Sequence, residues 1–111
     1  EDVAALLRAF SHGSCKSLRK IELNGNEHVD DSFARVFVQI LMLNMMPNLL
    51  SFSFAFTKLS ARGVGFILDY VESNRFTHVQ EIDVSGLCLG KMTRTAMKAR
   101  ATSAFSGIIS L

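Results

Sequence analysis

One pattern of apolar residues occurs three times in this chain at a nearly constant spacing. Each copy reads apolar-x-x-apolar-x-apolar, and the copies begin at Leu18, Leu49 and Val79. The complete triplets are Leu18, Ile21 and Leu23; Leu49, Phe52 and Phe54; and Val79, Ile82 and Val84. A period of about 30 residues is typical of a solenoid, whose units bury their apolar faces against one another. It favours display of a surface for another molecule over catalysis.

Each triplet predicts a β-strand, because its second and third apolar residues lie two apart and therefore point to the same face. We expect strands that begin near residues 20, 51 and 81 and pair in parallel, with those apolar residues in the core. The positions between them face outward and are polar or small. The outward positions that we take as candidate partner-binding residues are Lys20, Glu22, Asn24, Ser51, Ser53, Glu81 and Asp83.

The second half of each period predicts an α-helix. Val64, Ile67, Leu68 and Val71 have helical spacing, and the equivalent residues one period earlier repeat it. The same spacing occurs near the start of the chain at Val3, Leu6, Leu7 and Phe10, so we expect the chain to begin inside a helix. Helix ends are predicted at Gly13, Asn44 and Asn74, and Cys15, Met46 and Phe76 are predicted to be buried between helix and strand.

The repeats resemble the leucine-rich-repeat family. Its consensus L-x-x-L-x-L-x-x-N/C-x-L is met by LRKIELNGNEHV, LLSFSFAFTKL and VQEIDVSGLCL, and the helical half is similar to the ribonuclease-inhibitor-like subclass. The resemblance implies an α/β fold, a right-handed β-α superhelix with parallel strands inside and helices outside. Residues 1–111 would form one leucine-rich-repeat segment of a longer array, with a partial repeat 1–17 and repeats 18–48, 49–78 and 79–111. Further repeats or association would cover its ends.

The third repeat departs from this pattern after Leu89. Apolar residues at helical spacing return only near Phe105, Ile108 and Ile109, which predicts an insertion of roughly ten residues. The insertion carries four positive charges and no acidic residue, at Lys91, Arg94, Lys98 and Arg100. Three interpretations remain open: a solvated loop without function, an element that docks an acidic protein, or a contact with lipid headgroups or nucleic acid. We expect the insertion to protrude.

Phe56 follows the second strand at a position where the neighbouring repeats have Gly25 and Gly86. Two interpretations of this aromatic residue are equally favoured. In the first, Phe56 stands at the edge of the concave face and contacts a protein partner beside the acidic residues. In the second, it packs sideways against Leu50 or the next repeat.

Residue types that carry chemistry have plain structural interpretations here. Cys88 lies between two leucines and is predicted to be a buried or half-buried thiol, and the histidines are expected in solvated loops without metal-ligand spacing. Asp30 and Asp31 are expected to cap a helix rather than to bind a metal. Gly63 and Gly65 are expected to allow close packing of the helix and strand layers. We expect no catalytic residues, no metal and no cofactor.

Composition limits the class of partner. The net charge of +2 is too small to predict a nucleic-acid or membrane partner for the whole chain, so membrane-headgroup contact is disfavoured. No apolar stretch is long enough to span a bilayer. The two cysteines fall in different repeats, beyond disulfide reach, which favours a reducing, cytoplasmic location.

These observations and the resemblance predict a non-catalytic protein–protein interaction module of a scaffold or regulatory protein. Among ribonuclease-inhibitor-like proteins, the slightly long repeats of this chain and its basic insertion favour the cytoskeletal, actin-regulatory group. The alternative is that these repeats are the recognition part of a larger enzyme-linked protein, such as a ubiquitin-ligase substrate receptor or a nucleotide-switched immune sensor.

Overall fold

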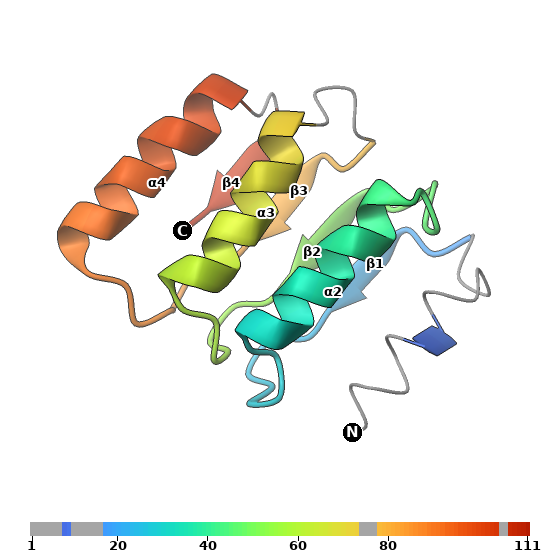
Figure 1. The fold of residues 1–111 in the computed structure, drawn as a ribbon, viewed down its shortest axis with the longest axis horizontal. Helices are drawn as coiled ribbons and strands as arrows, with labels where there is room; N and C mark the ends of the chain where they lie inside the picture. Colours follow the sequence, from blue (N-terminus) through green and yellow to red (C-terminus); the bar gives the residue numbers. More distant parts are fainter. Residues whose placement is uncertain (1–7, 10–16, 74–77, 105–106) are drawn as a thin grey trace.

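Strands and helices alternate along the chain in the computed structural model, which describes residues 8–9, 17–73, 78–104 and 107–111. The elements, in order, are β1 (Lys20–Glu22), α2 (Asp31–Met42), β2 (Ser51–Ser53), α3 (Ala61–Ser73), β3 (Glu81–Asp83), α4 (Lys91–Ala104) and β4 (Ile108–Ser110) (Figure 1). Of the helix predicted from Val3, Leu6, Leu7 and Phe10, only residues 8–9 are described, and they are helical. Those four residues lie outside the described residues, as do the predicted positions Gly13, Cys15, Asn74 and Phe76.

The four strands form one parallel sheet in the order β1-β2-β3-β4. Ile21 pairs with Phe52, Phe52 pairs with Ile82, and Ile82 pairs with Ile109. The three predicted strands and their parallel register are therefore confirmed, and the predicted inward residues Ile21, Phe52, Phe54, Ile82 and Val84 are buried while Leu23 is half-buried against the same core. β4 was not predicted.

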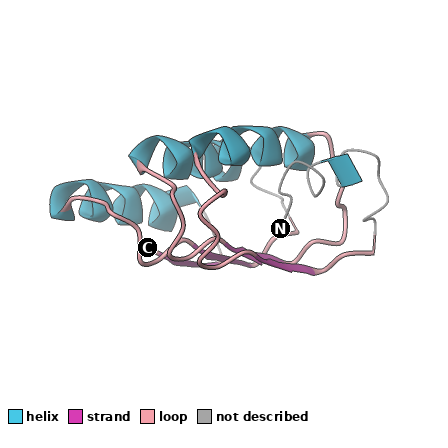
Figure 2. Ribbon diagram, turned by 90° about the horizontal axis from the view of Figure 1, so that it is seen from below, coloured by secondary structure: helices cyan, strands magenta, loops and turns pink. Residues whose placement is uncertain are grey.

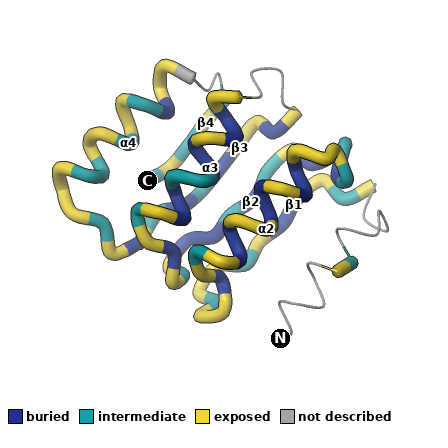
Figure 3. The backbone as a smooth tube through the Cα atoms, in the orientation of Figure 1, coloured by how far each residue is buried: buried dark blue, intermediate teal, exposed yellow. Residues whose placement is uncertain are grey.

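The molecule has two layers, with helices on one face of the sheet and no described element on the other (Figure 2). Each helix lies beside the next, α2 against α3 and α3 against α4. The shortest dimension is only 17 Å, as expected for one helix layer on one sheet. The buried residues of α2 and α3 form stripes (Figure 3), so the core lies between the two layers.

Aromatic rings join α2 to β2 at the centre of this core. The ring centroid of Phe37 lies 5.1 Å from those of Phe52 and Phe54, both in edge-to-face arrangements. Phe33 meets Phe54 edge to face at 5.4 Å. Such ring geometries are favourable in addition to the area that they bury. Phe52 and Phe54, at two positions where the consensus has leucine, therefore serve the contact between helix and sheet.

The ends of α2 follow from its sequence. The Asp30 carboxylate accepts a hydrogen bond of 3.0 Å from the N–H of Phe33, which caps the helix as predicted. At the other end, Asn44 has a left-handed conformation with φ of 57°. The N–H groups of Asn44 and Met45 donate to the carbonyls of Leu41 and Ile40, which is the hydrogen-bond pattern of a Schellman motif. The predicted helix end at Asn44 and the buried Met46 are both confirmed.

The third repeat contains no protruding insertion, so that prediction is wrong. Residues 91–104 are the helix α4, which lies beside α3, and the expected helical segment around Ile108 is the strand β4. Lys, Met, Arg and Ala favour helix formation, but the apolar stripe that marks such a helix is almost missing. Among the described side chains of α4 only Ala101 is fully buried, beside half-buried Met97.

We predict that Phe54→Ala lowers the free energy of unfolding by about 3 to 5 kcal/mol, because Phe54 is fully buried among three other rings. Denaturant unfolding followed by circular dichroism measures this loss. Phe56→Ala removes the same side chain at a site that is 69% exposed and serves as the matched control. Equal losses for the two variants would contradict the assigned register.

Candidate functional site: the uncovered sheet face

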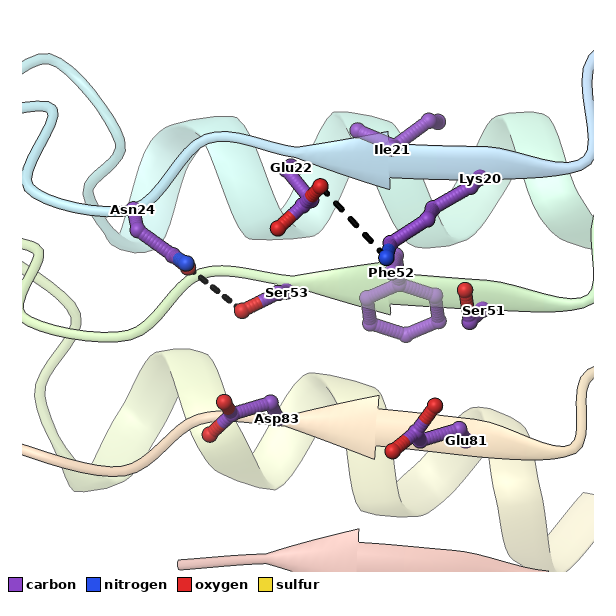
Figure 4. A pocket seen from close by; sticks show the side chains of 9 residues that line it. All are labelled: Lys20, Ile21, Glu22, Asn24, Ser51, Phe52, Ser53, Glu81 and Asp83. Atoms are coloured by element: carbon purple, nitrogen blue, oxygen red, sulfur yellow. Dashed lines mark hydrogen bonds and ion pairs between the residues drawn. The ribbon is translucent and has the colours of Figure 1, made fainter.

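A hollow of about 120 Å³ lies on the uncovered face of the sheet. We use "sheet face" for this surface, and Figure 4 shows the hollow with outward side chains from β1, β2 and β3 around it. The residues that line it are Lys20, Ile21, Glu22, Asn24, Ser51, Phe52, Ser53, Glu81 and Asp83. All the residues predicted for the concave face except Phe56 are therefore brought together.

Short serines on β2 make the hollow, since the side chains on either side of them are longer. Strand register places Ser51 between Lys20 and Glu81, and Ser53 between Glu22 and Asp83. The four flanking residues carry formal charges, three negative and one positive. The floor of the hollow is therefore small and polar, and its walls have a net negative charge.

Hydrogen bonds hold several of these side chains in place. Asn24 Oδ1 accepts from the hydroxyl of Ser53 and, at 3.0 Å, from the N–H of Ala55. Asp83 Oδ1 accepts from the N–H and the hydroxyl of Ser85, at 3.0 and 2.7 Å. Lys20 Nζ lies 3.5 Å from Glu22 Oε1, an ion pair between side chains that are both more than half exposed. Exposed pairs of this kind contribute little to stability.

Phe56 lies beyond the end of β2 and packs against the next repeat, as the second predicted arrangement has it, while its contact with a partner stays a prediction. Its ring packs over Gly86 of the next repeat, and a Cβ added to Gly86 would collide with the ring. At the same time Phe56 remains 69% exposed. Its backbone has a left-handed φ of 57°, and the equivalent Gly25 and Gly86 have φ of 72° and 69°. A bulky residue is uncommon in this conformation.

Ile108 and Ser110 extend the sheet face, and sequence reasoning missed them. They pair with Glu81 and Asp83, and Ile108 is 64% exposed. The available signal was Ile109 and Leu111, which repeat the alternation of Ile82 and Val84 in the preceding strand. A spacing shorter than the earlier period, and Ser106 in place of the first apolar residue, concealed it.

The four basic residues of the supposed insertion lie on α4, in the helix layer, rather than on a loop. Two of them make contacts within the fold. A guanidinium N–H of Arg94 donates to the carbonyl of Leu87 at 3.0 Å, and Arg100 binds Glu72 of α3 through two hydrogen bonds of 2.6 and 2.7 Å and also binds Asp69. Lys91 and Lys98 are exposed. Binding of a partner by these four basic residues stays a prediction.

The contact between α3 and α4 shifts the pKa values of its groups. Hydrogen bonding to Arg100 lowers the pKa of the Glu72 carboxyl, and the hydrogen bonds to Glu72 and Asp69 raise the pKa of Arg100, against the opposing effect of partial burial. Both shifts favour the charged forms. Arg100 is therefore a structural residue that ties α4 to α3.

Asp31 links α2 to the start of α3. Its Oδ1 accepts from the N–H of Ser60 at 2.9 Å, and its other oxygen accepts from the Ser60 hydroxyl. Partial burial raises the pKa of Asp31, but hydrogen bonds from Ser60 and Gly63 and the charge of Arg62 outweigh it and hold that pKa below 3.8. A Cβ on Gly63 would meet this carboxylate and Leu59. Gly63 thus makes room for the Asp31 carboxylate that caps α3, and does not serve the predicted close packing of helix and strand layers. Gly65 does not serve it either, since the space beside it is open.

Other candidate chemical groups are dispersed over the described residues. Cys88 is exposed, so its predicted burial is wrong, while His28 and His78 are exposed as expected. Within residues 8–9, 17–73, 78–104 and 107–111, no three His, Cys, Asp or Glu side chains gather as metal ligands. No helix in this described part has the length and apolar character needed to cross a membrane.

A second hollow, of about 350 Å³, lies on the helix layer between α2 and α3. Its walls include Val38, Met42, Phe66 and Tyr70, with Arg35 and Asp69 among its polar residues. It is larger and more apolar than the hollow on the sheet face, and no sequence pattern pointed to it.

Comparison with known proteins gives no match: no protein-family model fits the sequence, and no curated protein is significantly similar to it.

We predict a pH dependence for the contact between Asp31 and Ser60. The pKa of Asp31 in the folded protein lies below its unfolded value, which is near 3.8. The ionised carboxylate therefore contributes fully to stability at pH values above the unfolded pKa, and this contribution is lost as the pH falls through the folded pKa. The difference in unfolding free energy between the wild type and Asp31→Asn should therefore shrink in acid. Ser32→Ala, at the neighbouring exposed position, should show no such trend in the same urea titrations.

We predict that Arg100→Gln loosens α4 while the rest of the sheet and helices stay intact, because few buried side chains hold this helix. Amide hydrogen exchange should become faster in α4 and remain unchanged in α2. Lys98→Gln removes the same charge from an exposed position of α4 and should change neither. Unaltered exchange in the Arg100 variant would show that the ion pairs do not hold the helix.

Proposed function

We propose that this chain is a non-catalytic protein-binding module of a scaffold or regulatory protein, built as a leucine-rich-repeat-like right-handed β-α superhelix. In this proposal a segment of another protein binds the sheet face. A cytoplasmic location belongs to the same proposal. The cytoskeletal role expected from the sequence is left out of this proposal, because one of its two grounds, the basic insertion, is instead the helix α4.

The observation that carries the proposal is a parallel sheet with one face uncovered by described residues (Figure 2). Parallel sheets are ordinarily covered on both faces, and their strands then have apolar residues on both sides. On β1, β2 and β3 the outward side chains are charged or small and polar, so this face is stable in water without a covering layer. An accessible parallel sheet with a polar surface supports a binding role.

The shape and rigidity of the face support the same role. Ser51 and Ser53 leave room above β2 for side chains of a partner, and the backbone below them is fixed in the centre of the sheet. The hydrogen bonds of Asn24 and Asp83 keep those side chains ordered before binding. Preorganised groups reduce the entropy lost on association.

We predict that Ser51→Tyr abolishes capture of the partner, because the larger side chain fills the hollow. Gln39→Tyr is the matched variant on the helix layer, where Gln39 lines the second hollow. Affinity capture with wild type and both variants, followed by quantitative mass spectrometry, should identify proteins retained by the wild type and Gln39→Tyr and lost with Ser51→Tyr. Loss with Gln39→Tyr alone, or with neither variant, would overturn binding at the sheet face.

A further inference from the structure

We propose that the segment bound at the sheet face is extended and basic, that its Arg or Lys side chain enters the hollow beside Glu81 and Asp83, and that a neighbouring apolar side chain packs on Phe56. This inference rests on the proposed function. It specifies the chemistry of the partner and assigns Phe56 as the apolar anchor of the interface.

Charge on the sheet face favours a basic occupant. The ion pair with Lys20 compensates Glu22, whereas no described cation pairs with Glu81 or Asp83. Figure 4 shows both of these carboxylates on β3, beside the serines of β2. A guanidinium or ammonium group inserted over the serines would form charge-assisted hydrogen bonds with them.

Asp83 is held in position for such a contact. One of its carboxylate oxygens accepts the N–H and hydroxyl of Ser85, which fixes the orientation of the whole group. Asp83 is half-buried and Glu81 exposed, so one carboxylate is rigid and the other can adjust to the length of the incoming side chain. Arginine and lysine stems can also pack along the apolar surface of Ile108.

Phe56 gives an independent indication of an apolar contact. Phe56 has a left-handed backbone conformation, which is strained for residues with a Cβ, whereas the equivalent positions in the neighbouring repeats are the glycines Gly25 and Gly86. The side chain gains little in return, since 69% of it is exposed. Burial of the ring by a partner would offset this backbone strain, because aromatic residues buried in an interface contribute strongly to affinity.

The spacing of the two features fits an extended segment along β2. Phe56 is the third residue after Ser53 and lies in a turn, so the two residues lie at most roughly 10 Å apart, the length of three residues of extended chain. A partner segment of about three to four residues therefore spans both features, with its basic residue in the hollow and its apolar residue on the ring.

The test uses the whole 111-residue chain and a random dodecapeptide library displayed on phage. Peptides selected at low ionic strength should contain more Arg and Lys than the unselected library. Their affinity should fall roughly tenfold in the Glu81→Gln, Asp83→Asn double variant, as expected for lost hydrogen bonds to charged groups. Glu27→Gln removes an exposed carboxylate outside the hollow and should leave affinity unchanged.

Phe56→Gly separates binding from folding. Glycine accepts the left-handed backbone, so the thermal midpoint should stay unchanged or rise, while affinity for the selected peptides should fall roughly tenfold, as for loss of an interface anchor. A fall in affinity together with a folded, equally stable variant supports the assignment. Unchanged affinity in this variant would overturn the role of Phe56.

The outcomes distinguish this inference from the proposed function. Peptides without Arg or Lys enrichment that still lose binding to Ser51→Tyr would overturn the basic partner and leave the sheet face as the binding surface. Peptides that bind equally well to Ser51→Tyr would contradict both. Self-association of the chain that disappears in the Glu81→Gln, Asp83→Asn variant would identify a second copy as the occupant and also overturn the inference.

Discussion

The packing of the Phe37 ring against Phe52 and Phe54 is the contact on which the arrangement of the molecule depends. It holds α2 on one face of β2, and the apolar stripe of α3 follows the same plan toward the sheet. Because every inward side chain contributes to this single core, the other face of the sheet receives only the alternate positions. On β1, β2 and β3 these alternate positions are charged or polar, so this part of the face suits contact with water.

Contacts between successive units turn this pattern into a rigid platform. Asp31 of α2 caps the start of α3, and Arg100 of α4 binds Glu72 near the end of α3. The strands are joined in parallel at the same register by backbone hydrogen bonds. The side chains of β2 and β3 on the sheet face thus project from backbone that is paired on both sides, which suits a surface that recognises a partner by fixed spacing and charge.

Most of the fold could be predicted from the sequence, except at α4 and β4. Sequence patterns detect a helix by its apolar stripe, but α4 turns Arg94, Met97 and Ala101 toward the fold and is joined to it in part by the hydrogen bond of Arg94 and the ion pairs of Arg100. Such partners are distant in the sequence and leave no local pattern. The exposure of Cys88 was missed because side chains alternate here: Leu87 and Leu89 both pack against the core, and Cys88 between them points outward.

The sequence by itself determined the β-α alternation, the parallel register of three strands and the outward residues of the candidate site, since these follow from periodicity along the chain. Only the tertiary structure decided that Phe56 lies over Gly86 yet stays exposed, that Asp31 and Arg100 connect neighbouring helices, and that Ile108 extends the sheet face. Each of these features is a contact between residues of neighbouring units, which lie about one repeat apart in the sequence. The local spacing of apolar residues predicts whether a side chain points into or away from the core. Which residue of another unit it contacts depends on how the units pack together.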